Sequence, residues 1–204
     1  MPVRKSSETK LLDAVDELMF TRGIEATPVD AVLARAGLSA ATMYRGFRSK
    51  EALVAAALER RQQRWQDTWC RAIETADNDE QRLLAVFDAI DDFADRPDGA
   101  RWCAFLGTAA EYADPPAEIA AAVEADTTHL RRTLRSLASN LPCTDPDGLA
   151  ESILLILTGD LAMRLRDHRH RTSGKARGIA ATLITASMNA ASFDQTGPRR
   201  SSIG

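Results

Sequence analysis

A short stretch of the sequence, GLSAATMYRGFRSKEAL at residues 37–53, combines hydrogen-bond donors with very small side chains. Thr42, Tyr44 and Arg45 can donate to oxygen atoms of phosphates or base edges, and an arginine can bind a guanine edge through two parallel hydrogen bonds. The alanines beside them leave room for close approach of the backbone. A helix with this surface can enter the major groove of DNA, which is about 12 Å wide.

Local signals predict the helices that position these donors. Apolar residues at helical spacing predict a first helix from about residue 7 to residue 22, which Gly23 ends. Thr27 is the predicted N-cap of a short second helix, because Pro28 and Asp30 follow it in the positions of a capping box.

Two further short signals complete this arrangement. Gly37 is predicted to end the second helix in a left-handed C-cap. Ser39 then caps a third helix that ends around residues 46–47, and Ser49 caps a long helix over residues 50–76. Two short helices joined by a glycine turn are typical of a helix-turn-helix, whose second helix enters the major groove.

The rest of the chain is also predicted to be helical. Alanine is frequent, glycine is sparse and β-branched runs are few, which favours helix. Capping residues, prolines and polar breaks delimit further helices at about 78–95, 100–112, 116–139, 149–166 and 175–193. The tail, residues 196–204, has no apolar periodicity and is predicted to be disordered. The predicted fold class is all-α, with about nine helices.

Composition and charge narrow the classes of function. Residues 1–50 hold eight Lys and Arg and six Asp and Glu. The rest of the chain holds 18 Lys and Arg and 23 Asp and Glu, so a mildly basic head precedes an acidic body. This asymmetry fits local contact with a polyanion. No apolar run approaches the ~20 residues that cross a membrane, and the N-terminus lacks a secretion signal. We therefore expect a cytoplasmic protein with no membrane partner.

Cysteine and histidine spacing gives no sign of a metal, cofactor or catalytic centre. Cys70, Cys103 and Cys143 are odd in number and include no CxxC pair, which argues against a disulfide framework or a zinc site. No Glu-x-x-His, Gly-x-Ser-x-Gly or P-loop motif is found. An α-helical enzyme is therefore the weaker alternative, and we expect none.

The stretch TPVDAVLARAGLSAATMYRGFRSKEAL, residues 27–53, resembles the TetR-like family of helix-turn-helix transcriptional regulators. The resemblance implies a helix-turn-helix near residues 28–47 within a DNA-binding head of residues 6–66. It further implies a C-terminal dimerisation and effector-binding domain over residues 67–195. Such a protein would bind a palindromic operator in double-stranded DNA as a homodimer, and a small molecule would release this repressor. A DNA-binding protein without an effector is the second alternative.

The resemblance also indicates which side chains contact DNA. These are Thr27, Ser39, Ala40, Thr42, Tyr44, Arg45 and Lys50. Arg45 is the best candidate for a base-edge contact, and a contact to phosphate is its alternative. Gly46 and Asp30 depart from the family pattern, because an aromatic or histidine and a basic or polar residue are more usual there.

Two residue sets in the C-terminal part carry the remaining predictions. Aromatic residues either line a cavity for a small apolar or aromatic effector or pack the core: Trp65, Trp69, Phe87, Trp102, Phe105 and Tyr112. Glu111, His129 and Arg131 are candidate polar contacts for such a ligand. The last two helices are apolar over more than one face, and either they close the monomer's own bundle or they form the dimer interface through Ile153, Leu157, Leu161, Ile179, Leu183 and Ala186.

Overall fold

The fold is all-α, as the sequence predicts. The structure, a computed structural model, describes residues 5–95, 103–166 and 172–196. Within these ranges the chain forms nine helices and no strand: α1 (Lys5–Arg22), α2 (Val29–Ala36), α3 (Ala40–Tyr44), α4 (Lys50–Glu74), α5 (Asp79–Ala94), α6 (Ala104–Glu111), α7 (Ala117–Ala138), α8 (Pro146–Arg166) and α9 (Gly174–Thr196). The predicted tail lies outside the described residues from residue 197 onward.

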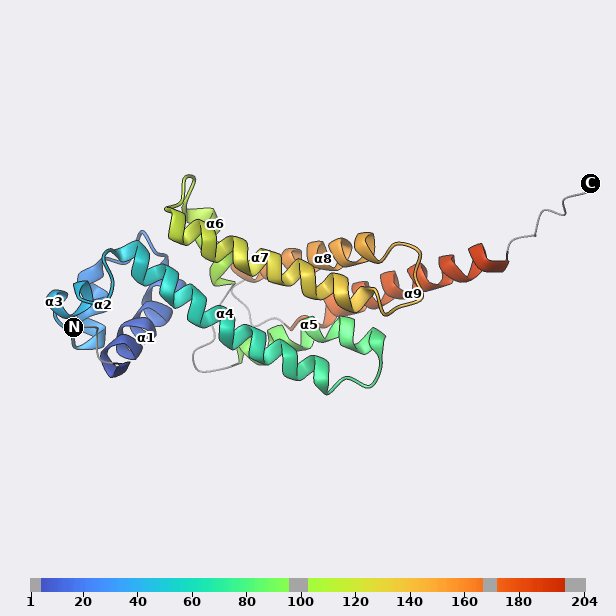
Figure 1. Ribbon diagram of the computed structural model, residues 1–204, viewed down its shortest axis with the longest axis horizontal. Helices are drawn as coiled ribbons and strands as arrows, with labels where there is room; N and C mark the ends of the chain where they lie inside the picture. Colours follow the sequence, from blue (N-terminus) through green and yellow to red (C-terminus); the bar gives the residue numbers. More distant parts are fainter. Residues whose placement is uncertain (1–4, 96–102, 167–171, 197–204) are drawn as a thin grey trace, which may run out of the picture.

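The molecule is elongated, with a small helical head at one end and a longer bundle behind it (Figure 1). The head consists of α1, α2, α3 and the start of α4. The helix α4 continues from the head into the bundle, where it packs on α5 and α7, and α8 and α9 complete the far side. The predicted division at residue 66 falls inside α4, so one continuous helix joins the two parts.

The two predicted serine caps are confirmed by their hydrogen bonds, and an asparagine caps α5 in the same way. Ser39 accepts from the N–H of Thr42, Ser49 accepts from the N–H of Ala52, and Asn78 accepts from the N–H of Gln81. Each side-chain oxygen satisfies one N–H group that the first turn of a helix leaves without a partner. These short-range signals fix where α3, α4 and α5 begin.

The predicted N-cap at Thr27 is wrong. The helix α2 begins at Val29, and Pro28 holds the N-cap position without a side-chain cap. The Thr27 hydroxyl is buried and donates instead to the carbonyl oxygen of Gly23, at 2.8 Å. Because this bond closes the loop after α1, the threonine oxygen does not reach the first turn of α2.

Two further helix boundaries differ from the prediction. The helix α3 ends at Tyr44 rather than around residues 46–47, since the N–H of Gly46 bonds to the Met43 carbonyl oxygen in a tighter turn. Glycine is a poor helix former, which explains the early end. The helix α8 begins at Pro146, three residues before the predicted start, because proline is well tolerated in a first turn.

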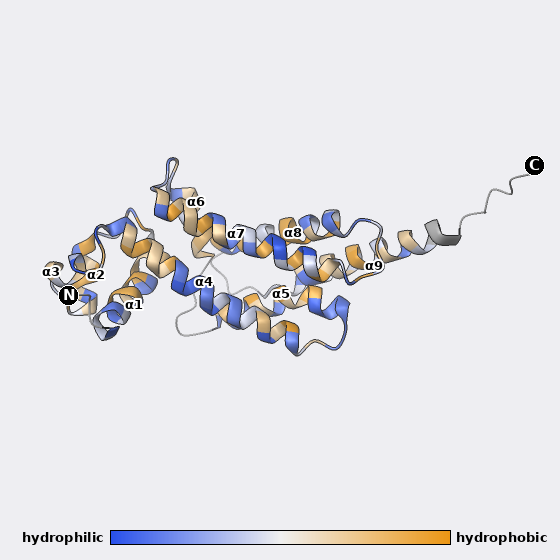
Figure 2. Ribbon diagram, viewed as in Figure 1, coloured by the Kyte–Doolittle hydropathy of each residue, from blue (hydrophilic) through white to orange (hydrophobic). Residues whose placement is uncertain are grey.

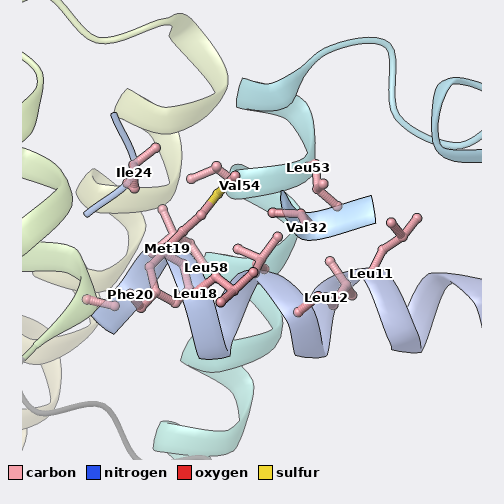
Figure 3. Packing of buried hydrophobic residues seen from close by; sticks show 14 of the residues in the cluster. Leu11, Leu12, Leu18, Met19, Phe20, Ile24, Val32, Leu53, Val54 and Leu58 are labelled. Carbon is pink, nitrogen blue, oxygen red and sulfur yellow. The ribbon is translucent and has the colours of Figure 1, made fainter. Parts of the chain in front are cut away.

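The head has its own apolar core, which also reaches the bundle. Side chains from α1 and α4, such as Leu11, Met19 and Leu58, interlock with Val32 of α2 (Figure 3). Met43 fixes α3 to this core and is fully buried. The same cluster includes Phe105 and Ala104 of α6 and Ile119 and Ala122 of α7. Burial of this shared apolar surface holds the head against the bundle.

A second apolar core fills the bundle. It joins Trp65 and Trp69 of α4 with apolar side chains of α5, α7, α8 and α9. Figure 2 shows the corresponding apolar stripes along these helices, alternating with polar faces. None of the helices in the described ranges has the length and apolar character needed to span a membrane.

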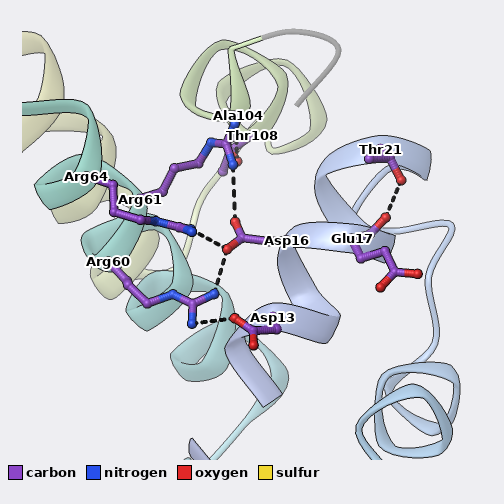
Figure 4. A network of polar contacts seen from close by, with 9 residues as sticks. All are labelled: Asp13, Asp16, Glu17, Thr21, Arg60, Arg61, Arg64, Ala104 and Thr108. Carbon is purple, nitrogen blue, oxygen red and sulfur yellow. Dashed lines mark hydrogen bonds and ion pairs between the residues drawn. The ribbon is translucent and has the colours of Figure 1, made fainter. Parts of the chain in front are cut away.

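A buried cluster of charges joins the head to α4 (Figure 4). Asp16 of α1 is buried and accepts hydrogen bonds from three arginines of α4: Arg60 at 2.6 Å, Arg61 at 3.3 Å, and Arg64. Arg60 also bonds to the exposed Asp13, at 2.8 Å. Because an unpaired buried charge is costly, the pairing of Asp16 fixes how α1 lies on α4.

Glu111, at the end of α6, provides a second link to the head. Its carboxylate accepts from the backbone N–H groups of Ile24, at 3.1 Å, and Glu25, at 2.9 Å. Both N–H groups belong to the loop between α1 and α2. Gly23 precedes them with a φ of 104°, a conformation that glycine adopts without strain. The loop is therefore held by the bundle through a carboxylate.

We expect Asp16→Ala to lower the free energy of unfolding by about 3–5 kcal/mol, because three arginines lose their shared acceptor in a buried contact. Urea unfolding followed by circular dichroism measures the change. The matched control is Asp13→Ala, whose exposed carboxylate contacts Arg60 alone among these arginines, and we expect it to cost less than about 1 kcal/mol. Equal losses for the two variants would contradict the role of Asp16.

Candidate nucleic-acid interface and internal cavity

The turn between α2 and α3 sets these helices at the outer end of the head. Gly37 adopts a left-handed conformation with a φ of 66°, as predicted, and the N–H of Leu38 bonds to the carbonyl oxygen of Leu33 at 3.0 Å. Leu38 is half-buried against the head core. The turn therefore points α3 away from the bundle, where nothing in the described chain covers its outer face (Figure 1).

The exposed side of α3 carries a connected set of donors and acceptors. The Ser39 and Thr42 hydroxyl oxygens lie 3.0 Å apart, and the Arg45 guanidinium donates to the Thr42 hydroxyl at 3.1 Å. Tyr44 is 55% exposed, which is unusual for an aromatic residue. The surface is small, polar and pre-arranged, so it can donate to phosphate and base-edge oxygens without first unfolding.

The other two predicted DNA contacts lie differently. The Thr27 side chain is buried, so its hydroxyl does not face the solvent. The Lys50 ammonium donates to the carbonyl oxygen of Ile24 at 2.6 Å and is only partly exposed. Both residues support the loop after α1 in this structure. The five predicted contacts from Ser39 to Arg45 are the ones brought together on one exposed surface.

The two departures from the family pattern are both exposed. Asp30 is exposed in the first turn of α2, where a negative charge interacts favourably with the helix dipole. Gly46 is exposed just after α3 and adds no side chain to the surface. The exposed donors of this surface therefore lie on α3 and the residues that flank it directly.

A cavity of about 80 Å³, partly open to the solvent, lies in the bundle near its junction with the head. Two of the predicted aromatic residues, Trp65 and Phe105, line it. Trp69 stacks on Trp65 at 5.7 Å and Phe87 is fully buried in the bundle core, so both lie behind the wall. Tyr112 packs against the head core instead. Trp102 lies outside the described residues.

The polar residues of the cavity were not predicted from the sequence. Asp126 of α7 and Arg61 of α4 line it, together with Arg164 of α8 and the Cys103 thiol. A usable signal exists for the first two, because each interrupts a buried apolar stripe: Asp126 follows Ile119 and Ala122, and Arg61 follows Val54 and Leu58. A charged residue in such a stripe indicates either a buried pair or a polar site.

Burial controls the protonation of these groups. Asp126 is 6% exposed and makes no hydrogen bond or ion pair with the described residues, and burial raises its pKa to about 7. Burial also raises the pKa of the Cys103 thiol to about 11, and the nearby Asp126 charge adds to this increase. Burial lowers the pKa of the Arg61 guanidinium, while Asp16 opposes that change. With a pKa of about 7, the Asp126 carboxyl is therefore close to half ionised at neutral pH.

The three candidate polar ligand contacts lie away from this cavity. Glu111 binds the α1–α2 loop, as described above. His129 contacts the edge of Trp69 at 5.9 Å and borders a shallow surface depression. Arg131 pairs with Glu151 on the exposed surface between α7 and α8, at 3.3 Å. Among the described residues, no group of His, Cys, Asp and Glu is arranged to hold a metal ion.

The residues predicted for a dimer interface divide between two faces. Ile153 and Leu157 are buried in the bundle core of the monomer, and Leu161 and Leu183 are partly buried against it. Ile179 is 52% exposed and Ala186 is also exposed. The structure adds Leu155, 68% exposed, and Met163 on the outer side of α8. These outward side chains form an apolar face on α8 and α9 that the monomer leaves uncovered.

We expect Asp126→Asn to stabilise the protein relative to wild type increasingly as the pH rises from about 4 to about 8. The pKa of Asp126 in the folded state, about 7, is above its ordinary value of 3.8, so wild-type stability is present at low pH and is lost as the carboxyl ionises. The difference should grow by at most about 1.4 kcal/mol per pH unit in urea unfolding. Asp92→Asn, at an exposed position of α5, is the control and should show no such trend.

A family model described as bacterial regulatory proteins, tetR family, matches residues 11–57, which span α1, α2, α3 and the start of α4. The HTH-type transcriptional activator FasR of Mycolicibacterium smegmatis is 33% identical over 90 residues. This similarity covers 44% of the present chain and 41% of FasR, so the chain matches less than half of that relative's length.

Solved structures share the fold over nearly the whole chain. SCO4454, a TetR-family transcriptional regulator from Streptomyces coelicolor, has a TM-score of 0.77 and 21% identity, and the match covers 93% of this chain and 98% of that one. A TetR-family transcriptional regulator from Cytophaga hutchinsonii has a TM-score of 0.77 and 16% identity, with 91% and 98% covered. Residues 11–57 are therefore a head of the tetR family, and the nine described helices share the fold of these TetR-family regulators.

Proposed function

We propose that this protein is a transcriptional regulator that binds an operator in double-stranded DNA through α3. The observation that carries the proposal is the exposed set of Ser39, Thr42, Tyr44 and Arg45 on a helix held outward by the turn at Gly37. In this arrangement Ser39, Ala40, Thr42 and Arg45 face the major groove, and Tyr44 and Lys50 contact phosphates. Thr27 supports the loop from inside, since its hydroxyl is buried.

The protein is proposed to act as a homodimer on a palindromic site. The supporting observation is the uncovered apolar face of α8 and α9, which includes Leu155, Met163 and Ile179. Gly159 and Gly178 lie on these helices with no heavy atom near the position of a Cβ, so a second chain can approach closely there. A two-fold interface would place two heads on successive turns of the duplex.

A small molecule in the bundle cavity is proposed to release the protein from DNA. Arg61 supports this coupling because it lines the cavity and also pairs with Asp16 of the head. The helix α6 supports it as well: Phe105 near its start lines the cavity, and Glu111 at its end binds the α1–α2 loop. A ligand that moves either element changes how the head is held.

Repression is the proposed direction of regulation, because a bound dimer can block access to a promoter that overlaps its operator. FasR, which is similar over part of the chain, is described as an activator. A promoter–reporter measurement with and without the protein reads the direction directly, and increased transcription would reverse this part of the proposal.

We expect Arg45→Ala to weaken binding to the operator by about 1–3 kcal/mol and binding to random duplex much less, because an arginine–guanine contact discriminates between bases. The operator is first selected from a pool of random duplexes with the wild-type protein, and fluorescence anisotropy then gives both affinities. Lys50→Ala should weaken binding to all duplexes and reduce the salt dependence of binding by about one ion.

The matched control is Arg71→Ala, which removes an exposed arginine at the far end of α4 and should leave both affinities unchanged. Equal loss on operator and random duplex for Arg45→Ala would show that Arg45 contacts phosphate rather than bases. An absence of wild-type affinity for any duplex at low salt would refute the proposed function.

We expect Leu155→Asp to convert the dimer into a monomer, because a dimer would bury an unpaired carboxylate at the α8–α9 face. The expected loss in dimer affinity is at least about 100-fold, and analytical ultracentrifugation measures it. Ala125→Asp, at an exposed position of α7, makes the same kind of change elsewhere and should keep the dimer. A wild-type monomer, or a dimeric Leu155→Asp variant, contradicts this interface.

A further inference from the structure

The Asp126 carboxylate is the group in the bundle cavity that has no bonding partner within the described chain. It lies on α7 among apolar wall residues that include Trp65, Phe93 and Phe105. It is 6% exposed, and no residue in the described ranges bonds to it. A buried carboxylate without a partner is costly, so an occupant that pairs with it gains the interaction that the folded chain does not supply.

The two arginines in the cavity wall already have carboxylate acceptors, and Arg61 shares its acceptor, Asp16, with Arg60 and Arg64. Arg61 donates to Asp16 and lies over the rings of Phe20 and Phe93, at 5.9 and 5.0 Å from the ring centroids. Its positive charge therefore takes part in the contact between the head and the bundle. An anionic occupant would have to compete with Asp16 for this guanidinium.

The Arg164 guanidinium has three hydrogen-bond acceptors within the described chain. It donates to Asp91 at 2.6 Å, to Asp160 at 3.2 Å and to the Ser173 hydroxyl at 2.7 Å. Ser173 in turn bonds to both of these carboxylates. With Arg164 satisfied in this way, the cavity presents an apolar surface and one carboxylate to an occupant.

We propose that the bundle cavity binds a small organic cation, an ammonium group attached to a compact apolar body, with the ammonium paired to Asp126. The apolar body would lie against Trp65, Phe93 and Phe105, whose rings also interact favourably with a cation. The inference deepens the proposed function, because it names the chemical class of the effector. It rests on that function only for the consequence of binding.

The size of the cavity limits the occupant. At about 80 Å³ it is roughly half the volume of an apolar cavity that binds benzene, about 150 Å³. A ligand of eight or nine non-hydrogen atoms therefore fits only with a small shift of a wall residue such as Phe93.

The test uses three probes of nearly equal size on the full-length protein: benzylamine, which is cationic at neutral pH, benzyl alcohol, which is neutral, and benzoate, which is anionic. Isothermal titration calorimetry and tryptophan fluorescence measure their affinities. We expect benzylamine to bind about 10- to 100-fold more tightly than benzoate, as for a charge-assisted pair. Benzyl alcohol should bind between the two.

Two variants test whether the preference for benzylamine depends on the Asp126 charge. Asp126→Asn keeps the shape of the side chain, removes its charge, and should abolish the preference for benzylamine, because the ammonium would then be buried without a partner. Asp92→Asn removes an exposed carboxylate from α5 and should leave the order unchanged. A preference for benzoate, a preference that persists in Asp126→Asn, or no binding of benzylamine would overturn the proposal. The comparison of probes on the wild-type protein decides the question even if the Asp126 variant does not fold.

Operator binding is measured on the same protein samples so that the two proposals are tested separately. If the protein binds its selected operator but shows no preference for benzylamine, the cation site is wrong and the DNA-binding proposal stands. If benzylamine is preferred through Asp126 but no duplex is bound at low salt, the cation site stands and the proposed function is wrong. Release of the operator by benzylamine from wild type, but not from Asp126→Asn, would join the two.

Discussion

The pairing of Asp16 with three arginines of α4 is the interaction on which the arrangement of the head depends. A helical head of this size has a small apolar core, and hydrophobic attraction is non-directional, so a directional polar contact adds to the definition of one orientation. A buried carboxylate does not permit sliding, because displacement of α1 would leave Asp16 and the arginines without partners. The contact therefore defines one orientation of α1, and α2 and α3 follow through the core that they share with it.

One of the arginines that pair with Asp16, Arg61, also lines the bundle cavity. Arg61 lies between Phe20 of the head and Phe93 of the cavity wall, so one side chain contacts both parts of the molecule. The short helix α6 provides a second path, from Phe105 at the cavity to Glu111 at the α1–α2 loop. Because both links are polar at the head and apolar at the cavity, a small shift of the wall can change hydrogen bonds that hold the head.

The parts of the structure that sequence reasoning recovers are those with local causes. Ser39, Ser49 and Gly37 act on residues within one turn, so helix starts and the left-handed turn could be predicted. The prediction of Thr27 as a cap was wrong because its hydroxyl donates to a carbonyl oxygen in the preceding loop. The partners of Asp16 and Glu111 lie more than 40 residues away, and no local pattern specifies them. The exposed donors of α3 were predicted because their exposure follows from one short helix with one buried residue, Met43.

The helices α8 and α9 show why an apolar sequence does not by itself identify an interface. Ile153 and Leu157 are needed to close the monomer's core, whereas Leu155 and Ile179 point outward. A helix that packs inside its own chain and also against a second chain must be apolar on two sides, so its periodicity is weak. The assignment of each side chain to one face requires the neighbouring helices to be known, since α7 and α5 take up the inner sides. The uncovered apolar area is the observation behind the proposed homodimer, because a second copy of the same two helices offers a surface of the same kind.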